Sequence, residues 1–275
     1  MMDFALNQMT APNLSLRDFL DLAQDLGCVG VELRNDMAGL GRSLLDELSP
    51  EQAGEMVRAR GLRFLGLSQV YPFNSWDDTR EAEVAALIDT AKRAGAETIS
   101  LIPRNDGTGG AEGERQANLR VALKACYPML VAADMVALVE PLGFGRSSLR
   151  SKQELVEMIA ALKMEDRFLI VHDTFHHTLA DGGPFFAAQT GIVHISAVVD
   201  PTLSVDQMED EHRVLIDGQD RLGNIDQIAA LIDAGYKGAF SYECFSPQTQ
   251  ALTDPVNALR QSFDFISAQL QAKAA

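Results

Sequence analysis

A short stretch near the middle of the chain combines residue types that bind metal ions and move protons. Three of the five histidines fall within residues 172–177, beside Asp173. An apolar run, Phe168 to Val171, leads directly into this stretch, as a buried strand would. Asp173 and His176 could therefore bind a metal ion or a substrate where the strand ends. The alternative is structural: polar side chains cap the turn that follows the strand. The local sequence does not separate the two interpretations.

Comparable polar residues follow the neighbouring apolar runs. Four consecutive runs lead in turn to Glu140, Asp173, His194 and Glu243. If these runs are parallel strands of a barrel, the four side chains meet at its C-terminal mouth, where chemistry occurs in such folds. Three carboxylates and one imidazole can hold a divalent cation. The oxygen-rich set suits Mn²⁺ or Mg²⁺, and the histidine also allows Co²⁺, Fe²⁺ or Zn²⁺. Without a cation the three carboxylates would repel one another and raise each other's pKa.

Loop residues beside this mouth are further candidates for substrate binding. Tyr71, Phe73 and Trp76 lie in one loop after an expected strand. They are expected to form an apolar wall against a ring-shaped substrate, and ordinary loop packing is the equal alternative. His177 either supports the metal ligands or lies at the surface.

Three further residues either end a strand, as the candidate ligands do, or adjoin one of those ligands in the chain. Each has an interpretation that does not involve the metal ion. Glu32 also ends an expected strand, but it could pair with Arg34 or Arg63. His172 and Cys244 each adjoin a candidate ligand in the chain. Because side chains alternate along a strand, these two should point away from the mouth.

Eight strand–helix units are expected to position these residues. Their strands are continuously apolar, as in a parallel sheet that is covered on both faces. Eight units in 275 residues predict a (β/α)8 TIM barrel that forms a single domain, residues 1–275. A doubly wound sheet is the alternative, but the sequence has neither a GxGxxG that opens a helix after a strand nor a GxxxxGK[ST]. The expected strands are residues 4–6, 29–33, 63–68, 98–102, 135–139, 168–171, 192–196 and 239–242.

Several of the expected helices begin with recognisable caps. Ser15, Ser49 and Ser151 are each followed three residues later by an acidic residue or a glutamine, which is typical of a helix N-terminus. The expected helices are residues 15–26, one that begins at 50, 79–94, 114–132, one that begins after 151, a short one near 185–190, 224–234 and 255–272.

Composition restricts the classes of partner. Lys and Arg number 23 and Asp and Glu number 39, which gives a formal net charge of −16. That charge repels nucleic acids and anionic membranes, and no apolar run approaches the length of a membrane span. The expected partner is therefore a small or neutral molecule, which the resemblance described below narrows to a polyol ketone or a sugar, and a homo-oligomer is possible. Three separate cysteines and the lack of a signal-peptide pattern predict a reduced, cytoplasmic protein.

The chain resembles the xylose isomerase-like family of sugar isomerase and epimerase barrels. Within that family it is most similar to 2-keto-myo-inositol (inosose) isomerases of inositol catabolism. The resemblance implies that one divalent metal ion (Mn, Mg, Co or Zn) is bound by Glu140, Asp173, His194 and Glu243. The stretches that carry the resemblance are VELRND (31–36), VYPFN (70–74), NDGT (105–108), VEPLGF (139–144), DTFHH (173–177), VHIS (193–196) and YECF (242–245).

The resemblance also implies an activity and its residues. Glu140 and Glu243 would act as base and acid in an intramolecular isomerisation of an inosose or related ketose through an enediolate, in either order. His176 would contact the substrate. The substrate arginine would be Arg213, with Arg221 as the alternative because residues 217–223 lack the Pro-Gly-x-Gly turn of relatives.

Other activities on the same scaffold remain open. They are ketose 3-epimerase, hydroxypyruvate-type isomerase and inosose dehydratase, because the same metal ligands could serve each of them. An abasic-site endonuclease is disfavoured by the charge of −16 and by only five histidines. A non-catalytic sugar-binding module is disfavoured by the intact set of ligands.

Overall fold

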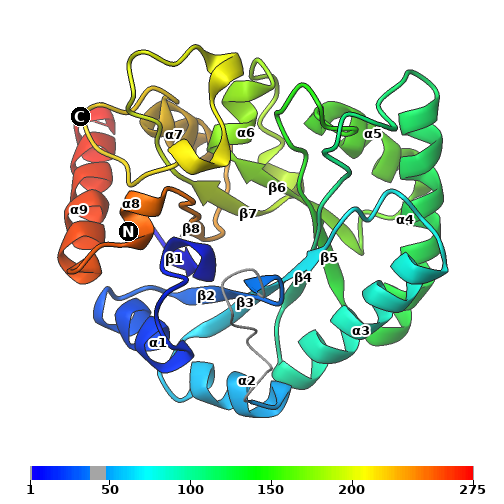
Figure 1. Cartoon of the computed structure of the whole chain (residues 1–275), viewed down its shortest axis with the longest axis horizontal. Helices are drawn as coiled ribbons and strands as arrows, with labels where there is room; N and C mark the ends of the chain where they lie inside the picture. Colours follow the sequence, from blue (N-terminus) through cyan, green and yellow to red (C-terminus); the bar gives the residue numbers. More distant parts are fainter. Residues whose placement is uncertain (1, 38–47, 275) are drawn as a thin grey trace.

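The computed structural model describes residues 2–37 and 48–274 of the chain. Eight parallel strands close into a barrel in which each strand pairs with the next and the last returns to the first (Figure 1). The predicted (β/α)8 barrel, a single TIM-barrel domain, is thus confirmed, and the doubly wound alternative is wrong. The strands are β1 (Phe4–Asn7), β2 (Gly30–Arg34), β3 (Arg63–Val70), β4 (Thr98–Leu101), β5 (Val136–Val139), β6 (Phe168–Asp173), β7 (Thr190–Ile195) and β8 (Phe240–Tyr242).

Helices surround the ring of strands and carry the chain from one strand to the next (Figure 1). None of those that the structure describes is long and apolar enough to cross a membrane. They are α1 (Leu16–Asp25), α2 (Pro50–Arg58), α3 (Asp78–Ala94), α4 (Glu114–Ala133), α5 (Lys152–Leu162), α6 (Thr174–Leu179), α7 (Asn224–Asp233), α8 (Pro247–Gln250) and α9 (Pro255–Ala274).

The predicted helix caps are confirmed. The hydroxyls of Ser15 and Ser151 each accept the backbone N–H three residues ahead. Ser49 does the same, and the side chain of Gln52 accepts the backbone N–H of Ser49 in return. These bonds satisfy N–H groups that a first helical turn leaves without partners. They fix where α1, α2 and α5 begin.

One predicted helix is misplaced. Instead of a helix near residues 185–190, the chain forms only a short 3-10 turn at Ala187–Gln189. The helix of this unit is α6, which follows β6 directly. The side chain of Asp173 explains its position, because Oδ1 accepts the N–H of His176 at 3.0 Å and caps α6. The structural interpretation of Asp173 is therefore correct, and its other oxygen remains available for the site described below.

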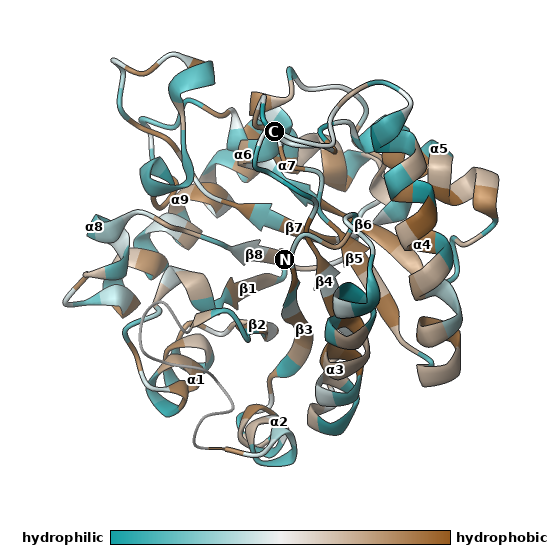
Figure 2. Cartoon of the chain, turned by 45° about the vertical axis from the view of Figure 1, so that its right-hand side comes forward, coloured by the Kyte–Doolittle hydropathy of each residue, from teal (hydrophilic) through white to brown (hydrophobic). Residues whose placement is uncertain are grey.

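Apolar side chains fill two layers of the barrel. The larger layer lies between the strands and the surrounding helices. The smaller one fills the interior of the barrel and comes from five different strands and from the residue just before β8. Figure 2 shows brown, hydrophobic colour along much of the barrel strands and teal over many of the surrounding helices and loops. The members of the inner layer are Ala5, Leu65, Leu138, Val171, Ile192 and Ala239.

The inner layer explains how the candidate ligands reach the mouth. Because side chains alternate along a strand, a residue two positions after an inward-facing residue also faces inward, nearer the strand's C-terminal end. Asp173 pairs with His194 in the parallel register of β6 and β7, so these two side chains lie at the same level. The three steps from the inner layer to the mouth are Leu138 to Glu140, Val171 to Asp173, and Ile192 to His194.

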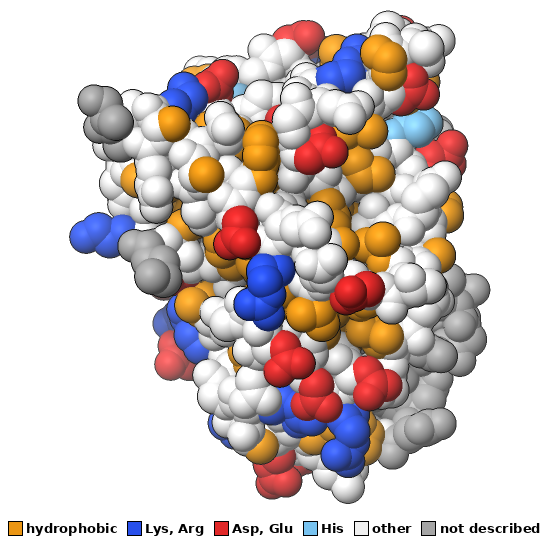
Figure 3. Space-filling model, turned by 90° about the vertical axis from the view of Figure 1, so that its left-hand side faces the viewer, with side chains coloured by type: hydrophobic (Ala, Val, Ile, Leu, Met, Phe, Trp, Pro, Cys, Tyr) orange, Lys and Arg blue, Asp and Glu red, His pale blue; other side chains and the backbone are white. Residues whose placement is uncertain are grey.

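The outer surface mixes charged and hydrophobic side chains. On the face that Figure 3 shows, Asp, Glu, Lys and Arg side chains lie among the hydrophobic ones. A homo-oligomer stays a prediction, because the large exposed hydrophobic side chains are spread over several elements. Among the described residues they are Tyr71, Val121, Val131, Val205, Ile232 and Leu252.

Candidate metal centre at the barrel mouth

Four buried side chains meet at the C-terminal mouth of the barrel. Glu140 follows β5, Asp173 ends β6, His194 lies in β7 and Glu243 follows β8. One ligand atom of each lies within 4.8 Å of those of the other three. His194 Nδ1 is 3.2 Å from Glu243 Oε2, 3.6 Å from Glu140 Oε1 and 3.9 Å from Asp173 Oδ2. The structure therefore brings together all four residues that the sequence singled out, here called the ligand cluster.

Glu32, in β2, holds the far side of the His194 ring. Both carboxylate oxygens of Glu32 lie 3.1 Å from His194 Nε2. Since a carboxylate can only accept, Nε2 carries the proton and donates it to Glu32. With a cation bound at Nδ1, the atom that faces the three carboxylates of the ligand cluster, the ring would be neutral and would offer its lone pair there. A carboxylate behind a histidine commonly orients an imidazole that binds a metal ion.

The expectation that Glu32 pairs with Arg34 or Arg63 is wrong. Arg63 pairs with Glu97 at the surface. Arg34 points into the mouth and binds carboxylates there. Glu32 and Arg34 occupy alternate positions of β2, so they share the inward face. The alternation that singled out the four ligands could have placed both residues in the site.

Two buried arginines neutralise part of the negative charge. Arg34 Nη1 lies 2.8 Å from Glu243 Oε1, and its other guanidinium nitrogens bind Asp36. Arg213 Nη2 lies 2.6 Å from Asp173 Oδ2 and 3.1 Å from Glu243 Oε2. Arg213 is only 1% exposed. Each arginine holds a carboxylate in a fixed direction, as charge-assisted hydrogen bonds do.

The ligand cluster fits a divalent metal ion. Among the described residues, His194 Nδ1 and Glu140 Oε1 are buried side-chain atoms without a hydrogen-bond partner. Buried polar atoms without partners are rare in folded proteins, and here both belong to the same cluster. Three carboxylates at these distances also favour a cation between them. Mn²⁺, Mg²⁺, Co²⁺ and Zn²⁺ all accept this mixture of oxygen and nitrogen ligands.

The surroundings shift the pKa values of Glu140 and Glu243 in opposite directions. Burial raises the pKa of Glu140, and the charge of Glu243 raises it further. Burial acts in the same sense on Glu243, but His194 and the two arginines outweigh it and hold the pKa of Glu243 well below its usual range. Burial lowers the pKa of His194, and the charges of Glu32 and Glu243 more than reverse that effect. Two carboxyl groups with unequal proton affinity thus share one site.

A cavity of about 280 Å³, here called the mouth cavity, opens onto the ligand cluster. His176 lines it and is 4% exposed. Its Nδ1 is buried and has no hydrogen-bond partner. The ring packs edge-on against Phe144 and Phe175, which fix its orientation. This position suits the predicted contact between His176 and the substrate, which stays a prediction.

The expected aromatic wall is only partly present. Tyr71 lines the mouth cavity. Phe73 is fully buried in the core, and Trp76 packs against the same core, so neither is part of the cavity wall. The N–H of Phe73 donates to a backbone carbonyl just after β4, which turns this loop back onto the barrel. Phe144 and Phe245 line the mouth cavity and were not predicted to do so.

Arg213, and not Arg221, reaches the ligand cluster. Arg221 donates to the backbone carbonyls of Asp200 and Leu203, within the loop after β7. Arg213 lies at the end of a short 3-10 turn in the same loop, and its Nε donates to Ser196 at 3.0 Å. A contact between Arg213 and a substrate is still a prediction.

Two residues that adjoin ligands point away from the mouth, as predicted. His172 lies outside the strands, where Nδ1 faces Lys152 and Nε2 faces Gln227. Cys244 is buried in the apolar layer between the strands and the helices. His177 is buried rather than at the surface, and it also contacts Lys152. Nothing in the sequence pattern had connected Lys152 with these histidines.

Comparisons with known proteins agree with this architecture. The model of the xylose isomerase-like TIM barrel family matches residues 20–269. A xylose isomerase domain-containing protein from Salmonella typhimurium LT2 is 30% identical with a TM-score of 0.88, over 98% of this chain and 97% of that one. The IOLI protein, crystallised with a zinc atom, is 19% identical with a TM-score of 0.85, over 98% and 99%. An L-ribulose 3-epimerase is 17% identical with a TM-score of 0.73, over 99% and 95%. No curated protein matches the chain.

Proposed function

The chain belongs to the xylose isomerase-like TIM barrel family, and from this premise we propose that it is a divalent-metal-dependent isomerase of an uncharged polyol ketone. The substrate is an inosose or a related ketose, and the setting is inositol catabolism in the cytoplasm. The observation that carries the proposal is the ligand cluster, in which two buried ligand atoms lack hydrogen-bond partners. The zinc atom in the structure of the IOLI protein supports the metal.

The ligand cluster contains the groups that such an isomerisation needs. When bound, the ion would stabilise the negative charge that develops on the substrate oxygens. Glu140 and Glu243 follow β5 and β8, which are not neighbours in the barrel. One carboxylate can therefore remove the proton from the carbon beside the carbonyl, and the other can return a proton to the neighbouring carbon. Asp173 and His194 complete the ligand set.

Two further side chains would hold the substrate. His176 lines the mouth cavity and its Nδ1 has no hydrogen-bond partner, so this residue would bond to a substrate oxygen. Arg213 lines the same cavity while it holds Asp173 and Glu243. In this role Arg213 fixes the direction of two ligands and polarises a substrate oxygen nearby. Tyr71 supplies an apolar surface at the rim.

The pairing of charges in the mouth cavity favours an uncharged substrate. Arg34 is bound to Asp36 and Glu243, and Arg213 is bound to Asp173 and Glu243. No other arginine or lysine lines this cavity in the part of the chain that the structure describes. A phosphate or carboxylate on the substrate would have to break one of these buried pairs. A neutral ketone avoids that cost, which disfavours a hydroxypyruvate-type isomerase.

A ketose 3-epimerase or an inosose dehydratase is the second candidate. Either could use the same ligand cluster, and the structural neighbours include an L-ribulose 3-epimerase and a probable 3-DHS dehydratase. The net charge of −16 disfavours an endonuclease that must approach phosphates. A sugar-binding module without catalysis would have no use for proton-transfer groups.

The test uses the purified full chain. Its metal content is measured, and the protein is then loaded separately with Mn²⁺, Co²⁺ and Zn²⁺. Each form is incubated in D₂O with inososes, neutral ketoses and hydroxypyruvate, and the products are followed by NMR. We expect about one metal ion per chain, and a neutral ketone that gains deuterium beside its carbonyl and isomerises. Loss of water would support the dehydratase, and inversion at one carbon the epimerase. The proposal fails if no ketone exchanges deuterium with any metal.

A further inference from the structure

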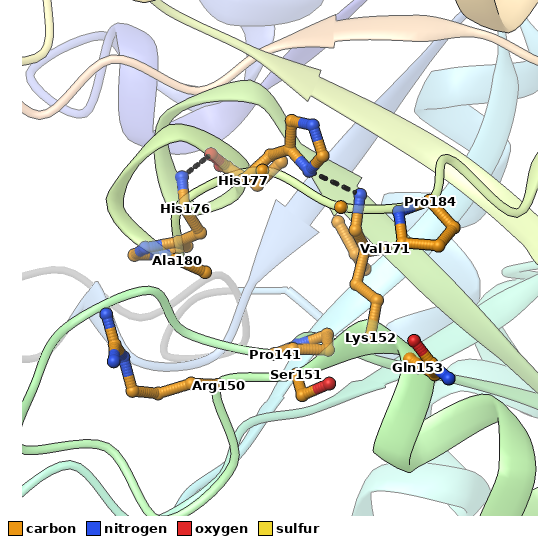
Figure 4. Close-up of a pocket in the computed structure, with 13 residues that line it drawn as sticks. Pro141, Arg150, Ser151, Lys152, Gln153, Val171, His176, His177, Ala180 and Pro184 are labelled. Atoms are coloured by element: carbon orange, nitrogen blue, oxygen red, sulfur yellow. Dashed lines mark hydrogen bonds between the residues drawn. The ribbon is translucent and has the colours of Figure 1, made fainter.

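A second cavity, of about 250 Å³, lies beside the barrel mouth and is here called the side cavity. Residues 141–153, around the start of α5, form one wall, and residues 171–184, from the end of β6 through α6, form the other. Figure 4 shows the side chain of Lys152 extending from the start of α5 toward His177, with Pro141 and Pro184 on either side. Lys152 is 9% exposed although lysine is normally a surface residue.

Two imidazoles hold the amine of Lys152. Its Nζ lies 2.8 Å from His172 Nδ1 and 2.8 Å from His177 Nδ1. His172 Nε2 lies 3.0 Å from Gln227 Oε1. The Nε2 of Gln227 donates to three other oxygens, so the amide orientation is fixed and Oε1 must accept from His172. Because His172 Nε2 carries a proton, the Nδ1 of its neutral ring accepts one from Lys152.

The geometry leaves one direction of the amine open. A tetrahedral nitrogen bonded to Cε and directed at two imidazoles has one position left. Among the described residues, the two imidazoles are the only hydrogen-bond partners of Lys152 Nζ. Lys152 also lines the side cavity, and the remaining position therefore faces this space. In the uncharged amine that position holds the lone pair.

The groups around Lys152 give little support to its charged form. The ring of Phe185 lies 5.7 Å from Nζ and favours the cation weakly. Burial lowers the pKa of Lys152 to about 7, and only the charge of Asp173 opposes this. Burial and the charge of Lys152 lower the pKa of His177 to about 4, so His177 is neutral.

We propose that Lys152 is a nucleophilic amine that captures small aldehydes or ketones reversibly, as an imine, in the side cavity. The lone pair of Nζ attacks the carbonyl carbon, an N–C bond forms, and the electron pair of the C=O bond moves to oxygen. The nitrogen gives up its two protons in turn, with His177 Nδ1 placed to accept them, and the oxygen takes up two protons and departs as water when the C=N bond forms. Hydrolysis reverses these steps. The captured ligand occupies a different cavity from the isomerase substrate, although His176 lines both cavities and Asp173 lines the side cavity.

Capture also changes the contacts of the two histidines. The free amine offers hydrogen to both His172 and His177, whereas a protonated imine keeps one N–H and a neutral imine keeps none. The adduct therefore gives up at least one hydrogen bond, which favours its reversal. An experiment must accordingly trap the adduct by reduction.

The test compares the labelling of lysines in the metal-loaded full chain. Acetaldehyde and cyanoborohydride are added for short times between pH 6 and pH 10, and modified peptides are quantified by mass spectrometry. At pH 7 about half of Lys152 is uncharged, against on the order of 1 in 2,500 for an exposed lysine with a pKa of about 10.4. Exposed Lys237 is the internal reference. We expect Lys152 to label at least about 10-fold faster than Lys237 at pH 7.

The labelling rate of Lys152 is divided by that of Lys237, so that the pH dependence of the reagents cancels. This ratio should be highest at pH 6 and fall steadily toward pH 10, because the uncharged fraction of Lys237 keeps rising over that range, whereas that of Lys152 can only about double above pH 7. Gln153→Lys places an ordinary amine at the exposed rim of the same cavity and should label like Lys237. Lys152→Arg should abolish the fast adduct. The proposal is overturned if Lys152 stays unmodified while Lys237 reacts, or if the ratio does not change with pH.

Discussion

The strand β6 separates two regions of the C-terminal face that bury ionisable groups in opposite ways. On its inner side, Asp173 enters a cluster of three carboxylates, of which Asp173 and Glu243 pair with buried arginines. On its outer side, the preceding residue, His172, contacts the amine of Lys152. This amine has no carboxylate partner among the described residues. Burial then lowers the pKa of that amine to about 7. Adjacent residues of one strand thus face a charged site and a largely neutral one.

The difference follows from the cost of burying charge. A buried ion is tolerated when an opposite charge lies within a few ångströms, and otherwise the group tends toward its neutral form. The inner region contains Arg34 and Arg213 and can hold ionised ligands ready for a cation. The outer region offers Lys152 two neutral acceptors, which hold the nitrogen in place without stabilising its charge. Two questions follow: whether the inner and outer regions are independent, and whether pairing with an opposite charge decides which buried groups stay ionised.

The largest effect is expected from Glu243→Gln, in the inner region. This change removes a ligand charge and a proton-transfer group while keeping the shape of the side chain. We expect turnover of the neutral ketone to fall by about 10³-fold or more, with the fold retained. Steady-state kinetics and circular dichroism measure the two properties. Glu97→Gln is the matched control, since Glu97 pairs with Arg63 at the surface, and it should keep wild-type turnover. Wild-type rates in Glu243→Gln would contradict the assignment of the inner region.

The next largest effect is expected from Lys152→Met, in the outer region. In the unfolded chain Lys152 keeps its proton up to about pH 10.4, but in the folded protein it loses it near pH 7. Between these values the unfolded state binds more protons, so the free energy of unfolding rises with pH. Relative to Lys152→Met, the wild type should gain about 2–3 kcal/mol between pH 7 and pH 9. Urea denaturation at each pH measures this difference.

A difference that stays constant over this range would show that Lys152 is charged in the folded protein. The outer region would then bury an unpaired cation, and the contrast with the inner region would disappear. Lys124→Met is the matched control, because Lys124 is exposed and lies on the surface of α4. Its variant should show no such pH dependence relative to the wild type.

Much of the inner region could be predicted from the sequence because it depends on local rules. A parallel barrel requires apolar strands, and strand alternation carries each inward position to the mouth, so Glu140, Asp173, His194 and Glu243 follow from the pattern. The helix after β6 was misplaced because Asp173 was not recognised as its cap. One carboxylate oxygen of Asp173 caps α6 and the other belongs to the ligand cluster. A sequence pattern does not show that one side chain has both roles.

The outer region could not be predicted because it depends on contacts between distant segments. Lys152 starts α5, whereas His172 and His177 flank the end of β6, and no sequence spacing connects them. The partner of Glu32 was wrong for the same reason, since His194 lies 162 residues further along the chain. Phe73 was expected beside the mouth because its loop follows the end of a strand, but its backbone bond turns the loop into the core.

Glu32→Gln tests whether the two sides of β6 act independently. The amide oxygen of this variant would still accept the proton of His194 Nε2, but it would lack the charge that strengthens the imidazole as a ligand. We expect the affinity for Mn²⁺ or Zn²⁺ to fall by about 10-fold to 100-fold, measured by competition with a chelating dye. His172→Asn, on the outer face of β6, should change this affinity by less than about 3-fold. A comparable loss in both variants would show that the regions are coupled.

The smallest effect is expected where an arginine pair is exposed. Arg146 binds Glu209 through two bonds of 2.7 and 2.6 Å and connects the loop after β5 with the loop after β7. Buried Arg213 also binds carboxylates at short distances, but the side chains of Arg146 and Glu209 are both more than 40% exposed. Water screens such a pair and competes for its hydrogen bonds, so Arg146→Gln should lower the free energy of unfolding by less than about 1 kcal/mol. Urea denaturation gives the value. A loss above about 2 kcal/mol would mean that direct contact, and not burial, decides how strongly charge pairs stabilise this face, and the explanation offered for the two sides of β6 would then be wrong.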